Sequence, residues 1–158
     1  MPIYMQIDGI KGDATEEGHK EWLRVDSVQF GVGRAIATPV GAAKDRETSQ
    51  PSVSDITVSR PQDGASAQLF QEACVGNKGK TVQIDFLTTG DPAETYFTIK
   101  LTNTLVANYS LSSGGDKPTE ALSLNFTKIE YDYKGSKEDR TAGGQKRAAF
   151  DLGLGKSA

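Results

Sequence analysis

The sequence predicts a mainly β protein with one helix. Residues 95–133 form two long stretches of alternating polar and apolar side chains, joined by a polar loop that contains Gly114 and Gly115. Alternation with a period of two places side chains on opposite faces of a strand. The other apolar runs are short and separated by glycine, proline and asparagine, and only residues 65–75 have helical spacing.

The long stretch at residues 95–112 predicts one dry face and one polar face. The dry face comprises Phe97, Ile99, Leu101, Leu105, Tyr109 and Leu111. The polar face comprises Tyr96, Thr98, Lys100, Thr102, Thr104, Asn108 and Ser110. Most strands run for about five or six residues, so this one needs a large sheet beside it. A strand face of small polar groups is more typical of a water-exposed wall than of an enzyme cleft.

Two strands are predicted near the N-terminus. Residues 3–7 alternate cleanly, and Gly9 ends the pattern. Residues 22–32 form the second strand, with Ser27 and Gln29 on the same face. Both faces of this second strand mix polar and apolar side chains, so the pattern leaves its orientation open.

Residues 34–53 are predicted to form a long extended loop. The segment contains Pro39, Gly41 and Pro51 and has no sustained period. Loops of this length are uncommon inside a compact domain and are usually functional or mobile.

The predicted helix follows a third strand at residues 54–60, which Pro61 ends. Asp63 is a suitable N-cap for a helix over residues 65–75. Four side chains form one stripe, which we expect to pack against the sheet. This stripe comprises Leu69, Phe70, Ala73 and Cys74.

The C-terminal half continues as strands in what we expect to be a single domain over residues 1–158. A fourth strand spans 81–87, ahead of the long fifth strand. In the sixth, the apolar parity changes, which predicts a bulge or coil near Thr127 to Lys128. The remainder, 134–158, reads as a polar tail with a possible last short strand.

Composition excludes several functions. The net charge of −3 gives no electrostatic help toward nucleic acid. No apolar run approaches the roughly 18 residues that suggest membrane insertion. With one histidine, His19, and one cysteine, Cys74, neither a catalytic triad nor a zinc site is expected. We therefore expect no enzyme, no cofactor and no metal. The first residues do not resemble a secretory signal, so we expect folding in the cytoplasm.

Three motifs resemble the haemolysin-coregulated protein (Hcp) family, the tube proteins of the type VI secretion system. These are IDGIKGDAT followed by HKEW, the helix start with Asp63, Ser66 and Leu69, and PTEALSLNF followed by YDY. They occur in this order, and the resemblance covers almost the whole chain. Ala67 is a departure, because many relatives have proline there, but alanine also suits a first helical turn.

The resemblance implies a fold and an assembly. Family members form a β-barrel of two packed antiparallel sheets with one flanking helix. They assemble as hexameric rings that stack into a tube within a contractile sheath, under a VgrG-type spike. Small effector proteins can ride in the channel. Such a protein assembles in the cytoplasm and is then secreted by contraction, without a cleaved signal peptide.

The resemblance also suggests roles for two sets of residues. Ser27 and Gln29 resemble channel-facing positions that contact effectors, although they could be ordinary residues on the wet face of a strand. The mixed-charge loop tip is expected to join stacked rings, although it could serve solubility alone. This tip comprises Lys44, Asp45, Arg46 and Glu47.

Two alternatives remain at this point. One is a phage-like contractile tail-tube protein. The other is a monomeric β-sandwich binding module with an aromatic ligand surface. The candidate aromatic residues for that surface are Tyr96, Tyr109, Tyr131 and Tyr133. We favour core and subunit contacts for these tyrosines, because interfaces are enriched in tyrosine.

Overall fold

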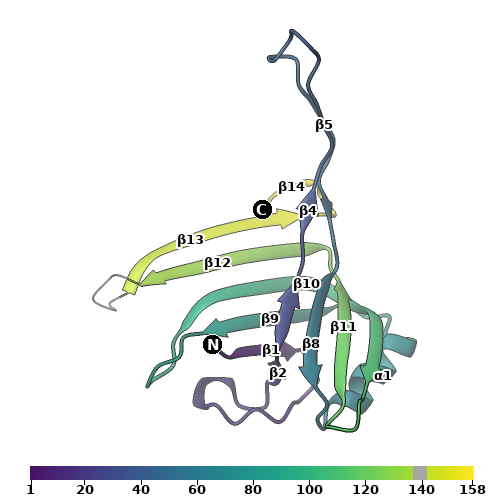
Figure 1. Cartoon of the computed structure of the whole chain (residues 1–158), viewed down its shortest axis with the longest axis vertical. Coiled ribbons are helices and arrows are strands. Elements are labelled where there is room, and N and C mark those ends of the chain that lie inside the picture. Colours follow the sequence, from purple (N-terminus) through teal and green to yellow (C-terminus); the bar gives the residue numbers. More distant parts are fainter. Residues whose placement is uncertain (137–141) are drawn as a thin grey trace.

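The computed structural model describes residues 1–136 and 142–158 (Figure 1). Its helical elements are the 3-10 turn η1 (Glu17–His19) and the helix α1 (Ser66–Val75). The strands are β1 (Ile3–Ile7), β2 (Leu23–Val25), β3 (Ser27–Gln29), β4 (Val32–Gly33), β5 (Ile36–Ala37), β6 (Glu47–Thr48), β7 (Ser52–Val53), β8 (Ile56–Pro61), β9 (Lys80–Leu87), β10 (Thr95–Ser112), β11 (Thr119–Asn125), β12 (Lys128–Ser136), β13 (Ala142–Asp151) and β14 (Lys156–Ser157). The predicted mainly β architecture with one α-helix is confirmed for the described residues.

Two antiparallel sheets share the long strand β10. Sheet A has the order β2-β1-β9-β10-β12-β13-β14, and sheet B has the order β10-β11-β8-β3. The first half of β10 lies between β9 and β12, and its second half pairs with β11. The predicted long strand is thus confirmed, at 18 residues. It passes from one sheet into the other.

The core lies between the inward faces of the two sheets. Met5 and Ile84 from sheet A and Leu122 from sheet B are fully buried within one apolar cluster. Full burial of a side chain of this size stabilises the fold by roughly 1.5–3 kcal/mol. Alternating side chains therefore set which face of each strand points inward.

A kink at Asn103 changes the side-chain pattern of β10. Asn103 has a positive φ of 53°, and the pairing with β9 shifts register between Leu101 and Thr104. As a result Thr104 is buried and Leu105 is 37% exposed. The prediction that Leu105 continues the dry face was wrong, because this irregularity inverts the alternation.

The segment that pairs with β10 is interrupted at the same level as this kink. β11 ends at Asn125 and β12 begins at Lys128, and the backbone N–H of Thr127 donates to the carbonyl of Thr102. This confirms the irregularity predicted near Thr127 to Lys128. β10 and the β11–β12 segment therefore pass between the two sheets at the same level.

The predicted strand at residues 22–32 is divided into β2, β3 and β4. β2 pairs with β1 in sheet A, whereas β3 pairs with β8 in sheet B. At the crossing, the N–H of Asp26 donates to the carbonyl of Ser59. The described residues do not form the predicted closed barrel, because no ladder joins β2 to β8.

The helix α1 packs on the inward face of sheet B beside β10. Leu69 is fully buried, but Phe70 is 58% exposed and Cys74 is also exposed. The prediction that these residues share one buried stripe was wrong, because only one flank of α1 meets the sheet. The helix begins at Ser66, and Asp63 accepts the N–H of Ala65 in the preceding turn instead of capping the helix.

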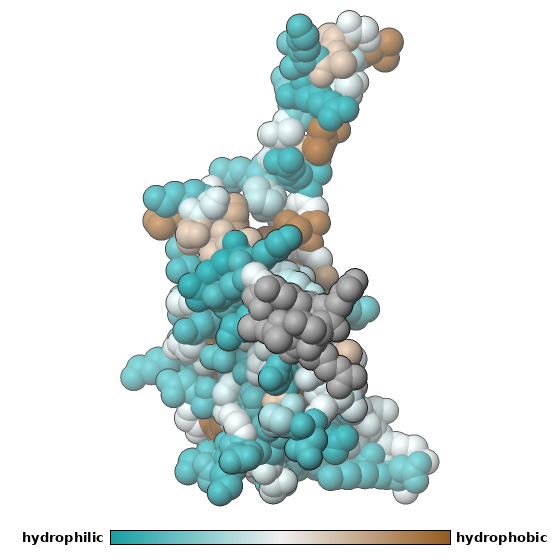
Figure 2. Space-filling model, turned by 90° about the vertical axis from the view of Figure 1, so that its left-hand side faces the viewer, coloured by the Kyte–Doolittle hydropathy of each residue, from teal (hydrophilic) through white to brown (hydrophobic). Residues whose placement is uncertain are grey.

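The predicted loop 34–53 and the strand β4 before it form a projecting hairpin over residues 32–53, which we call the arm (Figure 1). Its strands pair only through two short ladders, β4 with β7 at the base and β5 with β6 further out. Ile36 is 51% exposed and Val40 is fully exposed. Figure 2 shows hydrophobic side chains at the tip and lower along the arm. The predicted long loop is therefore a two-stranded ribbon that stands away from the core.

The segment 134–158 contains more strand than predicted. β13 has ten residues and pairs antiparallel with β12, and β14 follows it. Residues 137–141 of the predicted tail lie outside the described residues. Gln145, Lys146 and Arg147 are exposed, so no dry face marks this strand in the sequence.

Candidate functional site

The outward face of sheet B is a surface of uncharged and mostly small polar side chains, which we call the polar wall. Strand pairing places two rows of residues across its four strands. One row is Ser27, Ser59, Ala121 and Ser110, and the other is Gln29, Thr57, Ser123 and Asn108. Ser27 and Gln29 are exposed at one edge of the wall.

The polar wall follows from strand geometry. Successive side chains alternate between faces, so Val28, Val58 and Leu122 point into the core while their neighbours point outward. The hydroxyl and amide groups of the wall can donate and accept hydrogen bonds with water or with a passing protein. The structure thus brings Ser27 and Gln29 together with polar residues of the second half of β10.

Both edges of sheet B lack a strand neighbour within the described part of the chain. β3 pairs only with β8, and β10 from Leu105 to Ser112 pairs only with β11. Such edges present backbone N–H and C=O groups that can pair with another strand. Sheet B is therefore open at both sides.

A buried polar network lies under the polar wall. Arg60 and Glu120 are both fully buried and form an ion pair, and Arg60 Nη2 lies 2.6 Å from Asp63 Oδ2. Glu120 also accepts hydrogen bonds from Ser66 Oγ at 3.1 Å and Tyr109 Oη at 2.6 Å. Burial, with the Glu120 carboxylate beside it, raises the pKa of Tyr109 to about 12. The network ties β8, β10 and β11 to the start of α1.

Sequence reasoning missed this network, although a signal was present. Arg60 lies two residues after Val58, and Glu120 lies two residues before Leu122. Both charges therefore occupy inward positions of an alternating strand. A charge at such a position indicates a buried partner, because an unpaired buried charge is strongly unfavourable.

His19 is buried between two carboxylates. Its Nε2 lies 2.8 Å from Asp85 Oδ2, and its Nδ1 contacts Glu16. The ring stacks on Tyr4 with a centroid separation of 5.2 Å and meets Trp22 edge-on at 4.6 Å. His19 is therefore a buried, hydrogen-bonded histidine in the loop region before β2. It anchors the loop before β2 to β9, and the two carboxylates lie on opposite sides of the ring.

Chemistry-bearing clusters are scarce in the described residues. Among them, no group of three or more histidine, cysteine, aspartate or glutamate side chains is arranged to hold a metal ion. In the same part of the chain, no helix is long and apolar enough to cross a membrane.

The charged arm tip lies far from the polar wall. All four of its predicted contact residues are exposed, and the N–H of Asp45 donates to the carbonyl of Ala42 in a turn. The four residues are Lys44, Asp45, Arg46 and Glu47. The structure therefore separates the two sets of candidate residues, one on an edge strand and one at the end of the arm (Figure 1).

A comparison with known protein families identifies the family of this chain. The model of the family described as "Type VI secretion system effector, Hcp" matches residues 4–133. The chain belongs to the Hcp family. The family assignment that we predicted from the sequence is confirmed. As a member of the Hcp family, the chain is a component of type VI secretion, with the family's tube and effector role. Among curated protein sequences, none matches significantly.

Solved structures share the Hcp fold. A structure titled as a type six secretion system protein has a TM-score of 0.92 and 24% identity, with 99% of each chain covered. A type VI secretion system effector from Yersinia pestis has a TM-score of 0.76 and 25% identity, with 94% of this chain and 98% of that chain covered. Hcp1 from Salmonella typhimurium has a TM-score of 0.77 and 22% identity, with 99% and 98% covered.

Proposed function

We propose that this Hcp-family chain is the tube subunit of a type VI secretion system and forms hexameric rings that stack into a tube. The observation that carries the proposal is the polar wall between the two open edges of sheet B. A channel that moves proteins must be wetted and must not adhere strongly to its contents. An uncharged face of small polar side chains meets both needs.

The open edges provide the means of closing a ring. In a head-to-tail arrangement, β3 of one subunit lies beside the second half of β10 in the next subunit. Contacts of this heterologous kind generate a closed ring when the rotation between subunits closes on itself. Sheet B would then continue from subunit to subunit, and the polar walls together would line one channel.

The arm is the candidate for joining one ring to the next. It projects beyond both sheets and carries charges of both signs at its tip, Lys44 and Arg46 beside Asp45 and Glu47. Exposed ion pairs contribute only about 0–1 kcal/mol each and are screened by salt. With six arms per ring, these small contributions would add up to a contact between rings that forms and separates readily.

The remaining partners follow from this role. The tube would be enclosed by a contractile sheath and capped by a VgrG-type spike, and small effectors would travel beside Ser27 and Gln29. Rings would assemble in the cytoplasm and leave the cell on contraction. A phage-like tail tube would use the same surfaces.

A monomeric binding module has less support. Tyr109 lies under sheet B and donates to Glu120, whereas Tyr131 belongs to sheet A and packs on Phe97. The four tyrosines considered from the sequence therefore do not share one ligand surface.

Native mass measurement with negative-stain imaging tests the proposal. We expect a species of six 16.9 kDa subunits with an open centre. Raised salt should separate stacked rings before it dissociates single rings, because the arm tips are charged and exposed. A protein that stays monomeric at high concentration would contradict the tube assignment.

A further inference from the structure

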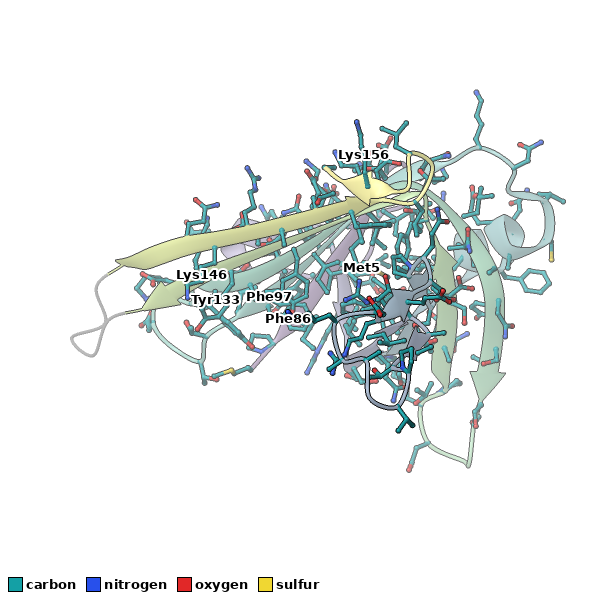
Figure 3. The ribbon with its side chains drawn as sticks, turned by 90° about the horizontal axis from the view of Figure 1, so that it is seen from above. Met5, Phe86, Phe97, Tyr133, Lys146 and Lys156 are labelled. Carbon is teal, nitrogen blue, oxygen red and sulfur yellow. The ribbon has the colours of Figure 1, made fainter. Side chains whose placement is uncertain are left out.

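The inward face of sheet A extends beyond the core as an aromatic surface. Strand register places Phe86, Phe97 and Tyr133 in one row across β9, β10 and β12. Tyr131 follows in the next row, beside Ala148 of β13. Figure 3 shows Phe86, Phe97 and Tyr133 on the same side of the sheet. We call these five residues the aromatic face.

The rings of the aromatic face pack against one another but are only partly covered. Ring centroids lie 4.9 Å apart for Phe86 and Phe97 and 4.4 Å apart for Phe97 and Tyr131. Even so, Tyr131 is 43% exposed and Tyr133 is 45% exposed. The base of the arm adds Phe30 and Val32 to form an apolar groove of about 360 Å³ against β12 and β13. Preformed apolar surface of this kind marks a contact site.

A second apolar surface lies on the exposed flank of α1. Ala67, Phe70 and Cys74 recur at the spacing of one helix face, and all three are exposed. The other exposed flank carries Gln68 and Gln71, and ends at Val75, which is also exposed. A solvent-facing helix flank is normally polar. Phe70 meets Tyr109 of the same chain edge-on, with ring centroids 6.0 Å apart, but it stays 58% exposed and has surface left for a further partner.

The two apolar surfaces lie at opposite ends of the molecule, each beside one open edge of sheet B. α1 packs next to β10, and the described parts of β12 and β13 extend away on the other side (Figures 1 and 3). Phe30, at the margin of the aromatic face, directly follows β3. A head-to-tail contact that brings β3 to the β10 edge therefore also brings α1 toward the aromatic face.

We propose that the apolar flank of α1 in one copy docks on the aromatic face of the next copy, an inference that rests on the proposed ring. Edge pairing alone is too small a contact, because β3 has only three residues. Stable interfaces bury about 1,200–2,000 Å² and depend on a few aromatic anchors. Phe70 would be that anchor, seated among Phe97, Tyr131 and Tyr133.

The cysteine on α1 allows a direct test. Ala148→Cys places a second thiol on the aromatic face, at the end of the molecule opposite Cys74. Mild oxidation of assembled protein should then join neighbours covalently, giving a ladder of up to six copies without reductant. Gln145→Cys is the matched control, because it lies on the same strand with its side chain on the opposite face. The same ladder must vanish when Cys74→Ser is added.

The outcomes separate the docking from the ring itself. Intact rings in which Ala148→Cys cross-links no more than Gln145→Cys would overturn the docking and leave the tube assignment standing. A protein that forms no rings would overturn both. Cross-linking that depends on both Cys74 and Ala148→Cys supports the docking.

A charge on the docking helix provides an independent measurement. Phe70→Glu should raise the subunit concentration needed for half assembly about tenfold or more, with unchanged circular dichroism, because Phe70 is exposed in the single chain. Gln68→Glu introduces the same charge on the other flank and should assemble normally. Equal assembly of the two variants would overturn the proposal.

Discussion

Arg60 and Glu120 form an ion pair in which both side chains are fully buried beneath sheet B. Glu120→Ala would leave the Arg60 guanidinium buried without its main counter-charge. Loss of one partner of a buried pair typically costs about 3–5 kcal/mol. We expect a fall of this size in the free energy of unfolding, measured by urea denaturation.

Tyr109→Phe is the matched control for that variant. It removes one hydrogen bond to Glu120 but keeps the ion pair, so the expected loss is only about 1–3 kcal/mol. If Glu120→Ala lowered stability no more than Tyr109→Phe, the ion pair would not be the main link beneath sheet B.

The kink in β10 depends on the conformation of Asn103. Its positive φ is one that asparagine tolerates and that β-branched residues strongly disfavour. Asn103→Val should therefore lower the free energy of unfolding by about 1–2 kcal/mol. Asn103→Gly should be close to neutral, because glycine adopts positive φ without strain. Equal effects of the two variants in thermal unfolding would contradict this account.

The contact between His19 and Glu16 predicts an acid-sensitive term in stability. The hydrogen bond from His19 holds the pKa of Glu16 below its ordinary value of 4.5. A lowered folded-state pKa stabilises the protein above pH 4.5, and this contribution is lost as the pH falls below that value. Glu16→Gln should remove this term and flatten the acid limb of the stability profile. An identical slope below pH 4.5 in both proteins would exclude a role for Glu16.

Local patterns predicted much of the fold. Alternation located most strands, and the parity change near Thr127 correctly located the break between β11 and β12. The kink at Asn103 was missed because the apolar period of β10 continues through it in the sequence. Residues 34–53 were predicted to form a long extended loop, but their pairing as a ribbon was missed because strands that pack on no core need not alternate polar and apolar side chains.

The candidate site was also only partly predictable from the sequence. Alternation identified the polar residues of β10, and the resemblance added Ser27 and Gln29. Strand register, which single segments do not reveal, was needed to show that these residues share one face. The exposed flank of α1 misled the prediction, because Phe70 and Cys74 have the helical spacing of a core stripe whether their partner is this chain or another.

Gln29 provides a test of the channel surface. Gln29→Arg would place six guanidinium groups in each proposed ring without changing an inward-facing residue. We expect normal rings and reduced retention of small effectors, measured by copurification. Gln6→Arg, at an exposed glutamine on β1, is the control for added charge. Unchanged effector retention in Gln29→Arg would remove Gln29 from the cargo surface.

The arm provides a test of stacking. Deletion of residues 38–49 removes the tip but retains the ladder between β4 and β7 at the base. We expect single rings with no tubes, seen by electron microscopy. Tubes of normal length would show that the arm does not join rings. In the intact protein, Lys44→Ala with Arg46→Ala should weaken stacking only modestly, because exposed charges contribute little.

The passage of β10 through both sheets has a mechanical consequence. The proposed channel lining and the layer behind it are linked by continuous polypeptide, once through β10 and again where β11 leads into β12. When a tube is driven forward, shear between these layers would load covalent bonds as well as side-chain packing. The two layers would therefore move as one body, and deformation would concentrate at the joints between subunits.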